Sequence, residues 1–487
     1  MNRIKDRLFS THYHPVLLKD VAKTARAKRA DGPDPGSQTI AMPLPTTADG
    51  QVGQQSTQAP EVASGLLALM GVLFFLQSWS PLGLLKTGSL FLLDRGMNVQ
   101  QIGAIEAATL FAPALTNPMM GLLADKLRRR KAVSLVAMIL SIALLVLLAI
   151  PRIGCAGCFW MLFVLMTTLS CVTLGGTIDA YTLDLLGPGR ASEYGRYRLW
   201  GSVGWATSAV STGLVMEHLG FFWNFPAIVG ATALMLLLCA CFLPRRTLAE
   251  ERSSAGEAAK PARLGALRRA VCHWRVLVAL SEVFLLGFGV GVAEKLIFAY
   301  VVHELHGSPS LCGIGVACMS STNVPLFFLG GRLLRLLGRD AMLVLSLLAH
   351  AARTYLYTRL TPATVVCFLP IELLHGITFS LARTASVDFV RAQLPAEWLT
   401  TGQQILMVVG PQGVGGGAGA LAGGWFMHLH GGRRTYELAS CGGGVIACFH
   451  VLACVLLRLC GRPTLLSDVR LDPDRAEPLM LGLADET

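Results

Sequence analysis

Residues 194–205 read YGRYRLWGSVGW and mark the passage from a basic, polar loop into an apolar run that continues to Leu219. Arg198 lies just inside this run, where an unpaired charge costs roughly 2.5–3.5 kcal/mol at the centre of a membrane helix. Asp179 lies in the preceding apolar run, and the midpoint between the two residues falls at the Gly-Pro-Gly turn of residues 187–189. Residues equidistant from the turn of an antiparallel helical hairpin lie level with each other. The stretch therefore predicts two membrane helices with an acid facing a base.

An aromatic side chain accompanies this predicted pair. Trp205 lies two helical turns beyond Arg198, so both side chains belong to one face of the helix. An ion pair beside an aromatic ring inside an apolar hairpin is typical of a solute site. We predict that Asp179, Arg198 and Trp205 bind substrate. The alternative is an ion pair that only holds two helices together.

The composition indicates a membrane protein. Hydrophobic residues make up 53% of the 487 residues and charged residues only 15%, and the mean hydropathy is +0.55. The net charge of +11 does not indicate nucleic-acid binding, because Lys and Arg gather in alternate loops, as membrane orientation requires. The thirteen cysteines are scattered through apolar runs as small hydrophobic residues. Cys155 and Cys158 share a short loop, and whether they form a disulfide is open.

The apolar runs recur at a regular spacing, and each is long enough to cross ~30 Å of hydrocarbon, which takes about 20 helical residues. They predict an all-α membrane protein of twelve helices in two bundles of six. The predicted spans are 63–93, 101–124, 132–150, 158–185, 197–218 and 224–243, then 274–302, 309–332, 340–359, 363–389, 402–428 and 437–459.

The remaining segments complete the predicted organisation. Residues 1–62 form a basic, then Gly- and Pro-rich tail, 63–243 the first bundle, 244–273 a basic linker, 274–460 the second bundle and 461–487 a second tail. Because the basic residues concentrate in the linker and in the loops on its side, both termini are predicted to be cytoplasmic.

A weak repeat relates the two halves. Residues 121–130 read GLLADKLRRR after the second span, and residues 331–340 read GRLLRLLGRD after the eighth. The first resembles the loop signature of the major facilitator superfamily, with Arg128 replacing a glycine, and the second has Arg335 where the acid should stand. We predict a conformational latch in the first loop, and the alternative is a basic loop that only sets orientation. The predicted latch comprises Gly121, Asp125, Lys126, Arg129 and Arg130.

Further residues make the resemblance narrower. The pattern from Gly195 to Trp205 resembles the fifth helix of the lactose permease family, with Asp179 at the position of its fourth-helix acid. That resemblance implies that the predicted pair and Trp205 contact sugar. The wider pattern, from about residue 63 to 460, resembles the major-facilitator-associated domain proteins. It includes RLWGSVG at 198–204, ELLHGIT at 372–378 and the glycine-rich stretch 413–424.

The second half carries a matching polar set. The midpoint between Arg353 and Glu372 falls at Thr361-Pro362, so the two residues are again level, and His375 lies one turn from Glu372. Arg353 and His375 resemble the arginine and histidine that the lactose permease family uses for proton coupling. Glu372 replaces its lysine, and Thr378 replaces its proton-carrying acid. We predict a polar or proton-coupling network of Arg353, Glu372 and His375, and the alternative for His375 is a satisfied core residue.

Three charges are weaker candidates. Glu106 lies near the start of the second span, and Glu294 and Lys295 are neighbours in the seventh. Neighbours lie about 100° apart on a helix, so we expect that these two cannot both face a central cavity squarely. Within the sequence we see no metal-ligand cluster, no catalytic triad and no cofactor motif, so an enzyme is not predicted.

These patterns predict a secondary active transporter that moves a small polar solute by alternating access. A sugar, a nucleoside or an organic acid would each suit Arg198 and Trp205, and coupling to protons is open. The expected partners are the lipid bilayer and the solute, and the protein is expected to be monomeric. The alternative is a membrane receptor or scaffold that keeps the transporter fold without flux.

Overall fold

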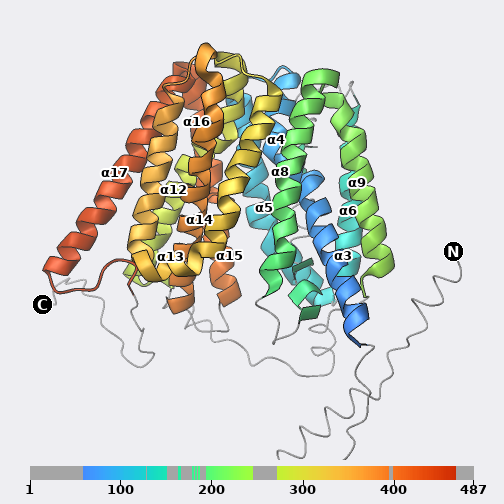
Figure 1. Ribbon diagram of the computed structural model, residues 1–487, viewed down its shortest axis with the longest axis horizontal. Helices are drawn as coiled ribbons and strands as arrows, with labels where there is room; N and C mark the ends of the chain where they lie inside the picture. Colours follow the sequence, from blue (N-terminus) through green and yellow to red (C-terminus); the bar gives the residue numbers. More distant parts are fainter. Residues whose placement is uncertain are drawn as a thin grey trace, which may run out of the picture. The chain divides into compact units, whose positions relative to one another are not determined.

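The computed structural model describes residues 59–127, 129–150, 193–244, 271–393 and 399–467, with four short pieces between 163 and 186. Every regular element in these ranges is helical (Figure 1). Residues 1–58 of the predicted N-terminal tail, residues 245–270 of the predicted linker, the loop with Cys155 and Cys158, and the last twenty residues lie outside them, whereas the last four residues of the predicted tail are helical.

The first half begins with a broken span. Helices α3 (Ala59–Trp79) and α4 (Pro81–Asp94) meet at Ser80, because Pro81 lacks the amide hydrogen that would continue α3. The buried Ser80 hydroxyl instead donates to the Ile228 carbonyl at 3.0 Å. The rest of this half is α5 (Val99–Leu127), α6 (Arg130–Ala149), α8 (Tyr194–Leu219), the 3-10 turn η2 (Phe221–Trp223) and α9 (Asn224–Phe242).

The second half begins with α12 (Trp274–Ala299) and a π-helical turn, η3 (Tyr300–Glu304). Helix α13 (Pro309–Tyr357) contains two predicted spans that turn at Gly338, whose φ of 77° favours glycine. The later elements are η4 (Pro362–Cys367), α14 (Phe368–Gln393), α15 (Leu399–Val409), α16 (Val414–His430) and α17 (Gly432–Leu459).

Eight helical segments of the described chain are long and apolar enough to cross a membrane, and the segment Pro309–Tyr357 covers two predicted spans. Helices α5 and α8 coincide with two further predicted spans, and the predicted span 158–185 is described only in pieces. Large apolar side chains also point away from the protein, with Phe449 73% and Leu459 78% exposed. Lipid is the solvent that such a surface fits.

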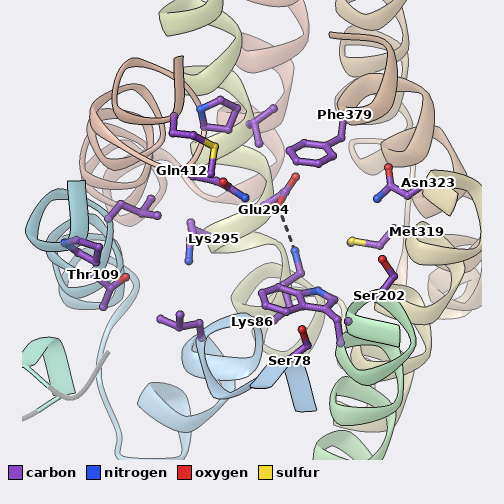
Figure 2. A pocket seen from close by; sticks show the side chains of 18 of the residues that line it. Ser78, Lys86, Thr109, Ser202, Glu294, Lys295, Met319, Asn323, Phe379 and Gln412 are labelled. Carbon is purple, nitrogen blue, oxygen red and sulfur yellow. Dashed lines mark hydrogen bonds and ion pairs between the residues drawn. The ribbon is translucent and has the colours of Figure 1, made fainter. Parts of the chain in front are cut away.

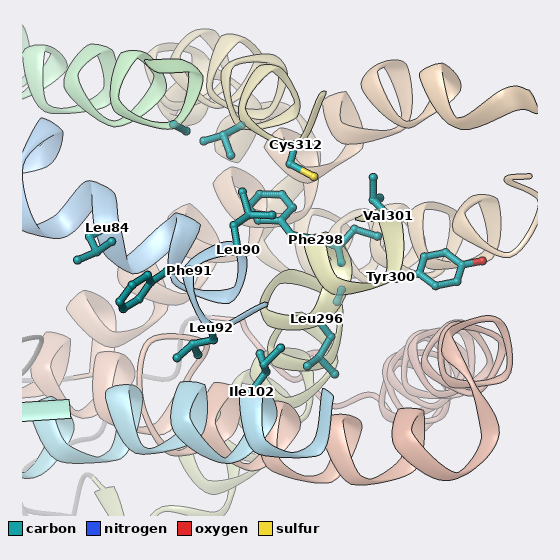
Figure 3. Packing of buried hydrophobic residues seen from close by; sticks show 14 of the residues in the cluster. Leu84, Leu90, Phe91, Leu92, Ile102, Leu296, Phe298, Tyr300, Val301 and Cys312 are labelled. Carbon is teal, nitrogen blue, oxygen red and sulfur yellow. The ribbon is translucent and has the colours of Figure 1, made fainter. Parts of the chain in front are cut away.

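The two halves pack together at one side. Helix α3 begins and α17 ends at the lower edge of Figure 1, here called the tail side, and the opposite edge is the far side. The main apolar core combines Phe91 and Ile102 of the first half with Leu296, Phe298 and Cys312 of the second (Figure 3). These residues lie toward the far-side ends of their helices. The far side is therefore closed by packed side chains from both halves.

Close helix crossings seal the same side. A Cβ on Gly103 of α5 would lie 2.8 Å from the Cα of Gly424 on α16, and one on Gly313 of α13 would lie 2.3 Å from the Ala209 carbonyl oxygen of α8. Only small residues allow backbones to approach so closely.

Candidate functional site

A cavity of about 540 Å³, lined by both polar and apolar side chains, lies between the two halves. It reaches toward the tail side as far as Arg198, one turn into α8, and Gln404, in α15. Among the described residues, the far-side ends of the same helices are packed and the cavity extends toward the tail side, so these helices have a conformation that is open toward the tail side. Its lining contains charges, amides, hydroxyls and aromatic rings, and Figure 2 shows many of them: Ser78, Lys86, Thr109, Ser202, Glu294, Lys295, Met319, Asn323, Phe379 and Gln412.

The structure brings Asp179 and Arg198 together, as the hairpin geometry predicts. Arg198 Nη1 lies 2.9 Å from Asp179 Oδ1, and the Arg198 side chain is 56% exposed. Arg198 and Trp205 line the cavity, and the guanidinium also lies 5.8 Å from the centre of the Phe74 ring. Arg198 can therefore reach a solute with its remaining donors while Asp179 holds the other end of the guanidinium. The role of the three residues in binding stays a prediction.

Tyr194 is a member of this group that the sequence reasoning missed. Its hydroxyl donates to Asp179 Oδ1 at 2.6 Å and accepts from Arg198 Nη1 at 3.3 Å. Tyr194 precedes Arg198 by one helical turn, so the same-face rule that selected Trp205 would also have selected it.

The second predicted set also assembles, through a tyrosine. Arg353 is fully buried, with its Nη1 2.5 Å from Nδ1 of His375 and its guanidinium 5.8 Å from the centre of the Tyr357 ring. The Tyr357 hydroxyl donates to Glu372. Only His375 of the predicted three lines the cavity, while Arg353 and Glu372 lie buried behind it. The proton-coupling role of the set stays a prediction.

Two ion pairs cross from one half to the other. Lys86 Nζ of α4 lies 3.2 Å from Glu294 Oε2 of α12, and Lys295 Nζ of α12 lies 2.7 Å from Glu106 Oε2 of α5. Glu294 and Lys295, which were not expected both to face a central cavity squarely, both line the cavity and point to different helices of the first half. The 100° between them is accommodated because long side chains reach around α12 toward two different helices.

The predicted latch falls mostly outside what the structure describes. Gly121, Asp125 and Lys126 belong to the last turns of α5, and their side chains lie outside the described residues, while Arg129 precedes α6 and is exposed. In the corresponding loop of the second half, Arg339 Nε lies 2.7 Å from Asp388 Oδ2 of α14. The loop signature has an acid where this loop has Arg335. Here the acid that contacts the basic loop is Asp388, which belongs to a neighbouring helix.

One group of described side chains has metal-ligand chemistry. Oδ1 of Asp340 lies 3.2 Å from Nε2 of His450 and 3.4 Å from Sγ of Cys454, and Nδ1 of His450 lies 2.7 Å from Oε1 of Glu282. Asp340 also accepts from the Leu466 amide at 3.0 Å. These atoms are engaged with one another, so the group is a hydrogen-bonded link between α12, α13 and α17.

Comparisons with known proteins agree with this architecture. Residues 66–438 match the MFS_1 like family. The maltose permease of Geobacillus stearothermophilus is 27% identical over 336 residues, which cover 68% of this chain and 78% of the permease.

Solved structures share the fold. The nucleoside transporter NupG superposes with a TM-score of 0.66 at 15% identity, over 79% of this chain and 98% of NupG. A D-xylose-proton symporter superposes with a TM-score of 0.58 at 13% identity, over 80% of this chain and 96% of the symporter. The chain therefore belongs to the MFS_1 like family and is a multi-pass integral membrane protein with the major facilitator fold.

Proposed function

We propose that this protein is a secondary active transporter that moves a small polar solute by alternating access. The observation that carries the proposal is the cavity between the halves, which is lined by charged residues of both and closed at the far side by helix packing. A solute bound there contacts both halves, so binding can be coupled to their movement. The basic loops favour a cytoplasmic tail side, and in this orientation the described conformation faces the cytoplasm.

The cavity chemistry supports a ring-bearing solute with several polar groups. Its volume of about 540 Å³ is in the usual range of small-molecule sites. Trp205 offers a flat apolar surface, Arg198 offers donors to hydroxyl or carboxylate groups, and Asn323, Gln404 and Gln412 offer amides. A sugar, a nucleoside or an organic acid satisfies this set. The similarity to a maltose permease puts sugars first.

Proton coupling is part of the proposal. His375 lines the cavity and contacts the buried Arg353, so a proton bound near His375 changes the charge of a region that faces the solute. The loop with Asp125 is proposed to act as the tail-side latch that closes when the far side opens.

Uptake by proteoliposomes tests the proposal. The purified full chain is reconstituted, and counterflow of labelled maltose, uridine and lactate is measured as representatives of the three solute classes. We expect saturable exchange of at least one class, reduced at least tenfold in Arg198→Gln, with Arg433→Gln on the exposed far-side surface as the control. Saturable binding without exchange would instead support a receptor that retains the transporter fold.

A further inference from the structure

The two ion pairs that cross between the halves have the same topology but different surroundings. Each joins α12 of the second half to the first half, through Lys86 of α4 or through Glu106 of α5. The acid of the second pair, Glu106, is 2% exposed, and its Oε2 receives Lys295. The acid of the first pair, Glu294, has a further neighbour on its other oxygen.

That neighbour is His375. Its Nδ1 lies 2.8 Å from Oε1 of Glu294 and, at the same time, 2.5 Å from Nη1 of Arg353. A guanidinium only donates hydrogen bonds, and an ionised carboxylate only accepts them. Nδ1 must carry a proton to bond Glu294 and must lack one to accept from Arg353. One nitrogen cannot satisfy both neighbours, so the ring has two alternative states that differ in the position of a proton.

We propose that Glu294 is the proton-carrying acid of this transporter and that His375 delivers the proton to it. The inference rests on the proposed transport function. In the unloaded state Glu294 is ionised and holds Lys86, and His375 carries its proton on Nδ1. A proton from the cavity binds Nε2 of His375, the Nδ1–H bond breaks and an O–H bond forms on Glu294. His375 ends neutral with a bare Nδ1, which accepts from Arg353.

Loading the proton has a mechanical consequence. Lys86 keeps its own charge but no longer faces an ionised carboxylate across the interface. One of the two ion pairs between the halves, here called ties, is therefore weakened. The Lys295–Glu106 tie is unchanged. Because both ties lie where the cavity meets the packed far side, a weaker tie favours opening toward the far side. Proton binding at one carboxylate thereby shifts the balance between the two conformations.

Charged and titratable groups from every neighbouring helix set this equilibrium. The cations around Glu294 are Lys86 of α4, Arg353 of α13 and Lys295, the neighbour of Glu294 on α12. Of the acids, Glu106 of α5 pairs with Lys295, and Glu372 of α14 accepts from the Tyr357 hydroxyl. The other ionisable side chains near the group are His350 and Tyr357 of α13 and Tyr436 of α17, all buried.

Amide hydrogen exchange of the full chain in lipid nanodiscs tests this inference, with pH as the only variable and no solute present. The readout is exchange in far-side peptides that cover residues 99–103 and 308–313, corrected for the intrinsic pH dependence of exchange. We expect wild-type exchange there to rise as the pH is lowered. In Glu294→Gln it should be high and independent of pH, because the amide mimics the protonated acid.

Glu106→Gln is the matched control. It removes the other tie between the same two halves, so it should raise far-side exchange yet retain the pH dependence. Lys86→Gln combined with Glu294→Gln leaves no stranded charge and should also be independent of pH, which separates the effect from misfolding. Equal behaviour of Glu106→Gln and Glu294→Gln, or a persistent pH response in both Glu294 variants, overturns the proposal.

The failure of this inference can be told from failure of the proposed function. If the wild type exchanges none of the three labelled solutes, the transport proposal fails whatever the hydrogen exchange shows. If the wild type transports, and proton-driven accumulation survives in Glu294→Gln, only the assignment of Glu294 is wrong. The expected result is that Glu294→Gln loses proton-driven accumulation.

Discussion

Gly313 of α13 passes so close to Ala209 of α8 that a Cβ on the glycine would lie 2.3 Å from the alanine carbonyl oxygen. This contact joins the two halves on the far side, opposite the open end of the cavity. A side chain at position 313 therefore destabilises the conformation in which the far side is closed, and its effect is not limited to one helix.

We expect Gly313→Leu to shift the protein away from the tail-side-open conformation. Overpacking of a tight contact costs typically about 1–3 kcal/mol, enough to change a two-state population several-fold. Far-side hydrogen exchange should rise. Gly442→Leu is the control, because a Cβ there meets nothing within 4 Å. Unchanged exchange in Gly313→Leu would show that this contact does not gate the far side.

Asp179 and Arg198 give a prediction that separates a binding site from a structural ion pair. Removing one charge of a fully buried pair costs roughly 3–5 kcal/mol, and we expect less here because the Arg198 side chain is 56% exposed. Asp179→Asn combined with Arg198→Gln should fold and insert normally but lose solute counterflow. Trp205→Ala should weaken binding without reducing expression. Wild-type transport by the double variant means that the pair only holds two helices together.

The predicted elements of this site follow from local rules. Helix rise is constant, so counting outward from the 187–189 turn placed Asp179 level with Arg198, and the two form an ion pair at 2.9 Å. The hairpin around Thr361 likewise brought Arg353 and Glu372 to a common cluster, but Tyr357 lies between them. A neutral tyrosine carries no signal that distinguishes it from other core residues.

The cross-half contacts could not be predicted in the same way. Lys86 and Glu294 are 208 positions apart, and no helical period relates residues of different bundles. Their contact depends on how the two bundles are oriented, which is set by the sum of many packing contacts. Each residue could still be singled out as an intramembrane charge, a property that by itself indicates function.

Tyr357 is expected to be essential for the buried network. Tyr357→Phe leaves the Glu372 carboxylate without its described donor, and the second oxygen of that carboxylate is already buried without a partner. Loss of a buried hydrogen bond to a charged group costs about 1–3 kcal/mol. We therefore expect a lower melting temperature in detergent. Tyr355 is an exposed tyrosine on the same helix, and Tyr355→Phe should have little effect on the melting temperature. A similar decrease in both variants would contradict the role of Tyr357 in the buried network.

The segment that follows α17 gives the last prediction. Residues 461–467 fold back on the second half, where Leu465 and Leu466 are buried, and Arg275 Nη2 donates to the Pro463 carbonyl at 3.0 Å. Asp340 accepts from the Leu466 amide at 3.0 Å and from the Thr464 hydroxyl at 2.8 Å. The segment therefore closes the tail-side end of this half with two apolar side chains and a set of hydrogen bonds.

Truncation after Gly461 should lower the melting temperature of the protein, because it exposes apolar surface and removes two donors from Asp340. Burying a leucine is worth about 1.5–3 kcal/mol, so the two leucines and the lost hydrogen bonds give an effect of several kcal/mol. Truncation after Ser467 is the matched control, since it keeps the packed segment and removes only the residues that follow it. Leu465→Ala with Leu466→Ala in the full chain should reproduce the part of the loss that comes from apolar burial. The remainder should be absent, because the hydrogen bonds of the segment's backbone are kept. Equal melting temperatures for the two truncated chains would show that the packed segment adds nothing to stability.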